Sequence, residues 1–85
     1  MFFESIATRP ENVVAAAKQE TSGLREMRIM RAQRGERGWL LKYITLDDDY
    51  PIAAIERSLT RKIGEAVSMV DLHYDFDTAA RLIYA

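Results

Sequence analysis

The sequence predicts a small α+β protein that folds as a two-layer sandwich, and three observations lead to this prediction. The chain has 85 residues, 48% of them apolar and 29% charged, which is the composition of a single globular domain over 1–85. Residues 52–66 carry apolar side chains at helical spacing. Residues 39–46 and 68–74 have the composition or the alternation of strands. We therefore expect helices on one face of an antiparallel sheet, with the other face left open.

The N-terminal part is expected to form a strand followed by a helix. Residues 2–7 are aromatic, aliphatic and β-branched and indicate a first strand. Thr8 and Glu11 have the spacing of a capping box, and Pro10 fits the first turn of a helix. This helix is expected to end near Gly23, where a left-handed cap suits glycine.

A hairpin over 24–46 is favoured for the middle of the chain. Residues 24–33 have helix-favouring composition, so a helix remains the alternative. Their apolar side chains would be scattered around a helix axis, however, whereas a strand places Met27 and Ile29 on one side. A turn with two glycines follows, and residues 39–46 then read as the second strand.

The second helix is the clearest element in the sequence. It is expected to start after the acidic run 47–49 and Tyr50-Pro51, with an aspartate as the cap, and to end near Gly64. Its apolar residues fall within an arc of about 80° at 100° per residue. These residues are Ile52, Ile55, Leu59, Ile63 and Ala66.

The C-terminal part is expected to add at least one strand. Residues 68–74 alternate, so that Val70 and Leu72 point to one side. Residues 81–84 could return as a last strand, and a short terminal helix capped by Asp77 is the alternative. The resulting order is β-α-β-β-α-β, a ferredoxin-like arrangement with a possible extra C-terminal strand.

Arginines recur at every third position through the expected hairpin: Arg25, Arg28, Arg31, Arg34 and Arg37. Residues 25–42 carry a local charge of +4 in a chain whose net charge is −1, so the remainder sums to −5. This separation of charge indicates an anionic partner or self-association. On a regular strand the spacing of three would send these arginines to both faces, which also fits a solvated hairpin or a charged edge strand.

The expected second hairpin strand is apolar on both sides. Trp39, Leu41 and Tyr43 share one side. The strand is therefore either buried on both faces or covered by a partner, and tryptophan and tyrosine beside arginine are typical of binding hot spots. We predict a non-enzymatic protein-binding module with an accessory, regulatory or inhibitory role. Its partner would have an acidic or mixed-charge surface or be a second copy. The candidate binding residues are Trp39, Leu41, Tyr43, Arg28, Arg31, Arg34 and Arg37.

An RNA- or DNA-binding domain that uses the same face is the alternative function. Segments 27–31, 37–39 and 54–59 resemble part of the second half of the RNA-recognition motif, in which strand aromatics stack on bases. In that family aromatic residues would stand where this chain has Leu41 and Ile44. The sequence pI of 5.8 also opposes non-specific affinity for phosphates.

Catalysis, metal and cofactor binding are not expected. Asp71, His73 and Asp75 alternate on one strand side and could ligate a divalent cation, but a half-exposed polar face is the commoner explanation. The sequence has no cysteine, no glycine-rich phosphate loop and no arrangement of a nucleophile with a base. It shows no signal peptide and no apolar run near the roughly 20 residues that span a bilayer, so we expect a soluble, cytoplasmic protein without a membrane partner.

Overall fold

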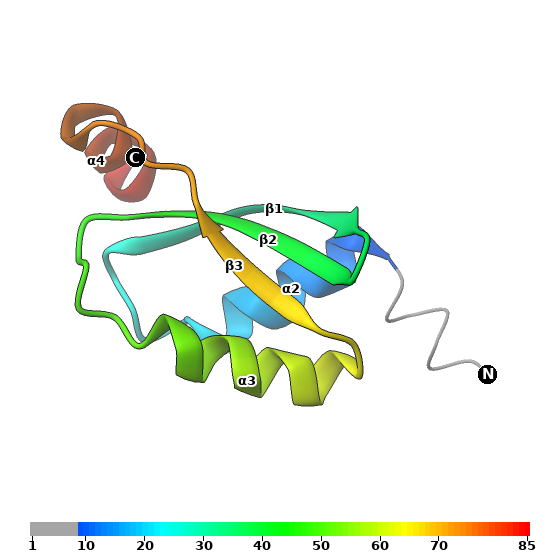
Figure 1. Ribbon diagram of the computed structural model, residues 1–85. Coiled ribbons are helices and arrows are strands. Elements are labelled where there is room, and N and C mark those ends of the chain that lie inside the picture. The colour runs from blue at the N-terminus through cyan, green and yellow to red at the C-terminus, as the bar shows by residue number, and fades with distance from the viewer. Residues whose placement is uncertain (1–8) are drawn as a thin grey trace.

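The computed structural model describes residues 9–85, which form a small α+β structure with three helices and a three-stranded mixed sheet (Figure 1). The elements are α2 (Pro10–Glu20), β1 (Met27–Gly35), β2 (Gly38–Thr45), α3 (Ile52–Ile63), β3 (Val67–Asp71) and α4 (Phe76–Tyr84). Helices α2 and α3 lie on one side of the sheet, and α4 lies near one end of the other side (Figure 1). The expected α+β class is confirmed.

The sheet topology differs from the ferredoxin-like order. The strand order is β1-β2-β3, with β1 antiparallel to β2 and β3 parallel to β2. Because β2 and β3 are parallel neighbours joined by α3, the sheet is mixed and not the antiparallel sheet that we expected. The first strand expected at residues 2–7 lies outside the described residues, as does the Thr8 half of the expected capping box.

The hairpin expected over 24–46 is confirmed as β1 and β2, and the helical alternative is wrong.

Gly38 is required where the hairpin meets the third strand. Its φ of 142° lies in the region that favours glycine, and a Cβ there would lie 2.2 Å from the carbonyl oxygen of Ala66. The next residue, Trp39, donates its backbone N–H to the same oxygen at 2.8 Å. A side chain at Gly38 would therefore separate β2 from the start of β3.

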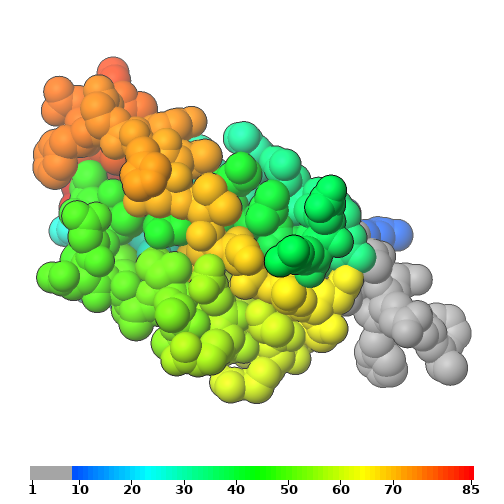
Figure 2. All heavy atoms as spheres, viewed as in Figure 1, coloured from blue at the N-terminus to red at the C-terminus, as the bar shows by residue number. Residues whose placement is uncertain are grey.

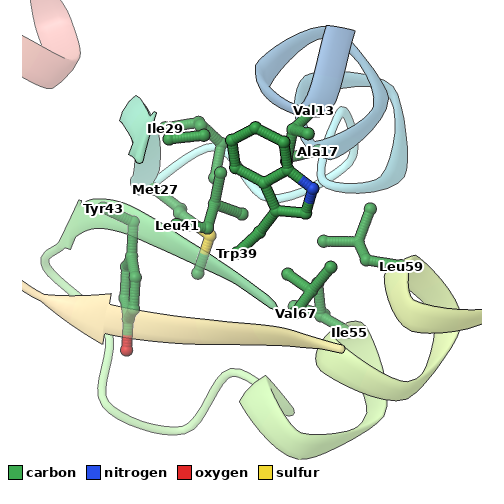
Figure 3. Packing of buried hydrophobic residues seen from close by; sticks show 11 residues of the cluster. Val13, Ala17, Met27, Ile29, Trp39, Leu41, Tyr43, Ile55, Leu59 and Val67 are labelled. Carbon is green, nitrogen blue, oxygen red and sulfur yellow. The ribbon is translucent and has the colours of Figure 1, made fainter. Parts of the chain in front are cut away.

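The core lies between the sheet and helices α2 and α3 (Figure 3). Ile55 and Leu59 are buried on α3, as the sequence predicted, while Ala66 lies beyond the helix and is exposed. The other helix contributes Val13 and Ala17. The sheet contributes Met27, Ile29, Ala32, Trp39, Leu41, Tyr43 and Val67. Side chains from both layers thus form one apolar cluster.

The helix ends agree only in part with the expected caps. Gly64 ends α3 in the left-handed conformation, as predicted. Its N-cap is Pro51, which makes no side-chain cap bond, so the expected aspartate cap is wrong. The Asp47 carboxylate instead accepts the backbone N–H of Asp49 at 2.8 Å, which stabilises the loop before the helix. Arg9 precedes α2, again without a side-chain cap.

The C-terminal segment forms a helix, so the expected last strand is wrong and the helical alternative is confirmed. The cap is Asp75 and not Asp77, because the Asp75 carboxylate accepts the backbone N–H of Thr78 at 2.9 Å. Hydrogen bonds from the side chain of Thr78 and from its backbone N–H lower the pKa of Asp75. Ala79 is buried on α4, and Ile44, on the second face of β2, is 1% exposed.

Polar contacts also attach α4 to the first strand. The Arg28 guanidinium donates to the carbonyl oxygen of Leu82 at 2.6 Å, and the Tyr84 hydroxyl donates to the Glu26 carboxylate at 3.1 Å. Burial from solvent raises the pKa of Tyr84, and the hydrogen bond to Glu26 adds to this shift. The chain itself therefore closes part of the sheet face that we expected to be open.

We expect Leu59→Ala to lower the free energy of unfolding by about 2–5 kcal/mol, because Leu59 is fully buried and its truncation leaves a cavity. Chemical denaturation followed by circular dichroism would measure the change. Arg57→Ala, an exposed site on the same helix, is the matched control and should change the stability little. Equal stabilities for the two variants would contradict the packing of α3 against the sheet.

Candidate binding face

The expected aromatic binding face is part of the core. Trp39, Leu41 and Tyr43 are 2%, 0% and 6% exposed and point towards α2 and α3. Desolvation raises the pKa of the Tyr43 hydroxyl. The expectation that these side chains lie on the open face is therefore wrong. The largest side chains of the central strand fill the space between the layers, where two helices must bury their apolar stripes.

Arg34 lies on the same side of the sheet as Trp39 and forms part of a polar cluster at the margin of the core. Its guanidinium lies 2.7 Å from the Glu65 carboxylate and 4.9 Å from the centre of the Trp39 ring. The indole N–H of Trp39 donates to Glu65 at 3.3 Å. Hydrogen bonding by Arg34 lowers the pKa of Glu65 and raises that of the guanidinium. Arg34 therefore stabilises the fold, and its charge is already matched.

A bulge in β1 decides where the other arginines lie. The register with β2 shifts between Ile29 and Arg31, so that one extra residue, Met30, enters the strand. The buried residues of β1 accordingly stand at positions 27 and 29 before the bulge and at position 32 after it. Arg28 and Arg31 thus lie on the same face, opposite to α2 and α3, although a regular strand would have separated them.

We call the uncovered part of this second sheet face the cationic face. It consists of the side chains that pair across the three strands away from the core: Arg31, Gln33, Leu40, Lys42, Ser68 and Val70. Leu40 and Val70 are half-buried, while Arg31 and Gln33 are exposed. The face combines two cations with an apolar centre. Helix α4 covers its neighbouring end, where Ile44 is buried.

The cationic face places two like charges directly opposite each other. Arg31 is the cross-strand partner of Lys42, and opposed like charges destabilise a sheet. Within residues 9–85, no carboxylate forms an ion pair with either side chain. Arg34, in contrast, forms an ion pair with Glu65, and Arg28 donates a hydrogen bond to a backbone carbonyl of α4. Among the described residues, this concentration of positive charge therefore has no carboxylate counterion.

A shallow hollow continues the cationic face towards the tip of the hairpin. It has a volume of about 390 Å³, and its lining includes Arg37, Leu40 and Ser68. In Figure 2 the hairpin tip, in green, lies beside the start of β3, in yellow, and away from α4 in orange and red. Arg37 is exposed at this turn. Three of the sequence-predicted arginines, Arg28, Arg31 and Arg37, are therefore placed along or next to one face.

Sequence reasoning missed Lys42, Leu40 and Val70 as members of an exposed face. One signal could have indicated it: apolar residues stand at positions 27, 29, 30 and 32, and the adjacent pair at 29 and 30 interrupts the alternation as a bulge does. Asp71, His73 and Asp75 do not form the polar strand face considered above, since β3 ends at Asp71. His73 lies 3.8 Å from Asp71, and the Asp75 carboxylate caps α4.

Comparison with protein-family models, with curated proteins and with solved structures found no match. Within residues 9–85, no group of three or more acidic or histidine side chains is arranged to hold a metal ion. No helix in this part of the chain is long and apolar enough to cross a membrane. The chemistry of the cationic face is therefore the observation that bears on function.

Acid should open the cluster around Trp39, because protonated Glu65 loses its ion pair with Arg34. The pKa of Glu65 is lowered in the folded state, so its contribution to stability is present above the ordinary glutamate pKa and is lost as pH falls through the lowered value. Emission from Trp39, the one tryptophan in the chain, would report this step. Glu65→Gln should abolish this acid-induced change in emission. Glu20→Gln breaks a different ion pair and should leave the change in emission as it is in the unchanged protein.

We expect repulsion between Arg31 and Lys42 to appear in a double-mutant cycle of Arg31→Gln and Lys42→Gln. Each change should relieve the same unfavourable contact, giving a repulsive coupling of about 0.2–1 kcal/mol that shrinks as salt is added. Unfolding free energies from urea denaturation would measure it. Arg31→Gln combined with Arg57→Gln on α3 is the control and should be additive. An attractive coupling between Arg31 and Lys42 would contradict the register that we describe.

Proposed function

We propose that this protein is a small non-enzymatic binding module that docks on the acidic surface of another protein through the cationic face. The observation that supports this proposal is the opposed pair Arg31 and Lys42 on an uncovered, partly apolar sheet face. Such a pair costs stability in the free protein, and an anionic partner would relieve that cost. Leu40 and Val70, next to the cations, supply apolar contact area.

The composition of the face favours a protein over a nucleic acid. Sheets that bind single-stranded nucleic acid usually stack bases on aromatic side chains. The aromatic side chains of β2, Trp39 and Tyr43, are buried on the other side, and the cationic face as defined has no aromatic residue. The net charge of −1 also gives little general attraction to a phosphate backbone. An acidic protein surface needs only the few cations and the apolar centre that this face provides.

We expect Arg31→Ala to weaken binding of poly-glutamate by about fivefold, which corresponds to about 1 kcal/mol. Arg57→Ala, which removes an exposed arginine from the opposite layer, is the matched control and should bind like the unchanged protein. Calorimetric titration at two salt concentrations would measure both affinities. Lys42→Ala should behave like Arg31→Ala, because both charges belong to the same face.

A parallel titration with single-stranded poly-uridine separates the two classes of partner. We expect weak binding that Arg31→Ala and Arg57→Ala reduce to a similar extent. Tighter binding to poly-uridine than to poly-glutamate, lost in Arg31→Ala, would favour the nucleic-acid function over the proposed one. Equal effects of Arg31→Ala and Arg57→Ala on poly-glutamate would mean that the cationic face is not a distinct site. Sedimentation at increasing protein concentration would detect self-association through the same face.

A further inference from the structure

The two edges of the sheet differ in their capacity to accept another strand. At the β3 edge, side chains of α3 accept two of the outward backbone N–H groups. Thr60 accepts the N–H of Val67 at 3.1 Å, and Glu56 accepts that of Met69 at 2.7 Å. A strand approaching β3 would have to displace both acceptors, so this edge is closed.

The β1 edge has no comparable cover within residues 9–85. Trp39 donates its backbone N–H to Ala66 and Tyr43 accepts from Leu72, so both residues direct their backbone groups towards β3. The β1 residues opposite them, Arg34 and Ile29, therefore direct theirs away from β2, to the edge. No side chain of the described residues accepts these N–H groups. β1 is also the longest strand, with nine residues.

From the usual spacings of helices and strands we infer that the helix layer extends beyond this edge. Packed helices lie about 8–10 Å apart and strands about 4.8 Å apart, so two helices side by side cover roughly four strands, and this sheet has three. Helix α2 packs under β1, and a groove of about 390 Å³ runs between them. Its apolar lining includes Val14 and Ala15 of α2 and Met30 and Ala32 of β1. By these spacings, one more strand could lie above the outer flank of α2.

We propose that the acidic partner binds as an extended segment that adds a fourth strand to the β1 edge. This inference rests on the proposed function and specifies the form of the partner. Side chains of an added strand alternate between the two faces of the sheet. Those on one face would fill the groove beside Val14 and Ala15, and those on the other would lie beside Arg31. The segment that fits therefore alternates apolar and acidic residues.

Charge argues against a second copy of β1 as the occupant. The strand carries Arg28, Arg31 and Arg34, and it has no acidic residue. Two such edges side by side would bring like charges together, which is how natural edge strands avoid pairing with themselves. An acidic strand removes this repulsion. The lining of the groove also includes Glu11 and Lys18. No ion pair of Lys18 is seen among residues 9–85.

The test uses a peptide of four Glu-Val repeats with blocked ends and the full 85-residue chain. We expect the peptide to shift the amide resonances of Ile29, Ala32 and Arg34 and to slow their hydrogen exchange. Two derivatives carry N-methyl groups on every glutamate or on every valine. Because alternate residues of a strand direct their N–H groups to opposite edges, one derivative should lose affinity by about tenfold or more and the other should bind nearly as before.

A pair of protein variants tests the groove. Ala15→Glu places a carboxylate at the groove and should weaken the Glu-Val peptide severalfold. Ala53→Glu, at an exposed alanine of α3, is the matched control and should have no effect. Both alanines are exposed on helices, so both variants should fold. Equal binding by these two variants would overturn the proposed seat of the peptide.

The outcomes separate this inference from the proposed function. Binding that requires Arg31 but is reduced equally by both N-methyl derivatives would overturn strand addition and leave the cationic face in place. Binding of poly-glutamate without binding of the Glu-Val peptide would do the same. Binding unaffected by Arg31→Ala would overturn both. Slow exchange at the β1 edge in the free chain would show that a second copy or another segment of the same chain already fills the edge, and would overturn strand addition.

Discussion

The burial of Trp39 is the interaction on which the rest of the structure depends. Its ring packs in the core that β2 shares with α2 and α3 (Figure 3), and its backbone N–H joins β2 to the start of β3. Its indole N–H and its ring face bind Glu65 and Arg34, which connect the margin of the core to the edge strand. Through its backbone and its side chain, Trp39 thus connects β2 with Arg34 of β1, with the start of β3 and with Glu65, which follows α3. A change that exposed it would loosen the sheet and the helix layer together.

Local sequence patterns predicted the local elements of this fold and failed where distant contacts decide. The period of Ile55 and Leu59 identified α3, and the scatter of apolar residues around Met27 favoured a strand over a helix there. Parallel pairing of β3 with β2 is a non-local arrangement that no residue in either strand specifies. The C-terminal segment is short, so its choice of helix over strand depends on the Asp75 cap and on the Ile44 surface that it covers.

The candidate site was predicted in its charge but not in its geometry. Arginines at every third position were visible in the sequence. The bulge at Met30 was not predicted, and it reverses which positions of β1 face the core, so that Arg28 and Arg31 lie on one face. The aromatic residues were assigned to the wrong side, because both faces of β2 are apolar and composition alone does not say which one the helices cover. The arginines therefore differ in their contacts: Arg34 binds Glu65 and Trp39 at the margin of the core, Arg28 binds α4, and Arg31 is exposed on the cationic face.

The closed edge at β3 limits what any assembly of this protein can become. Molecules can join edge to edge into an unlimited sheet, as in fibres, only when each molecule has a free strand edge on both sides. Here Thr60 and Glu56 accept two of the outward N–H groups of β3, so among the described strands β1 offers the open edge. Copies of this protein therefore cannot join through their sheets into an open series, because each copy offers one free edge and can take part in only one such pairing. Side chains of the helix that builds the core thereby also limit self-assembly through the sheet.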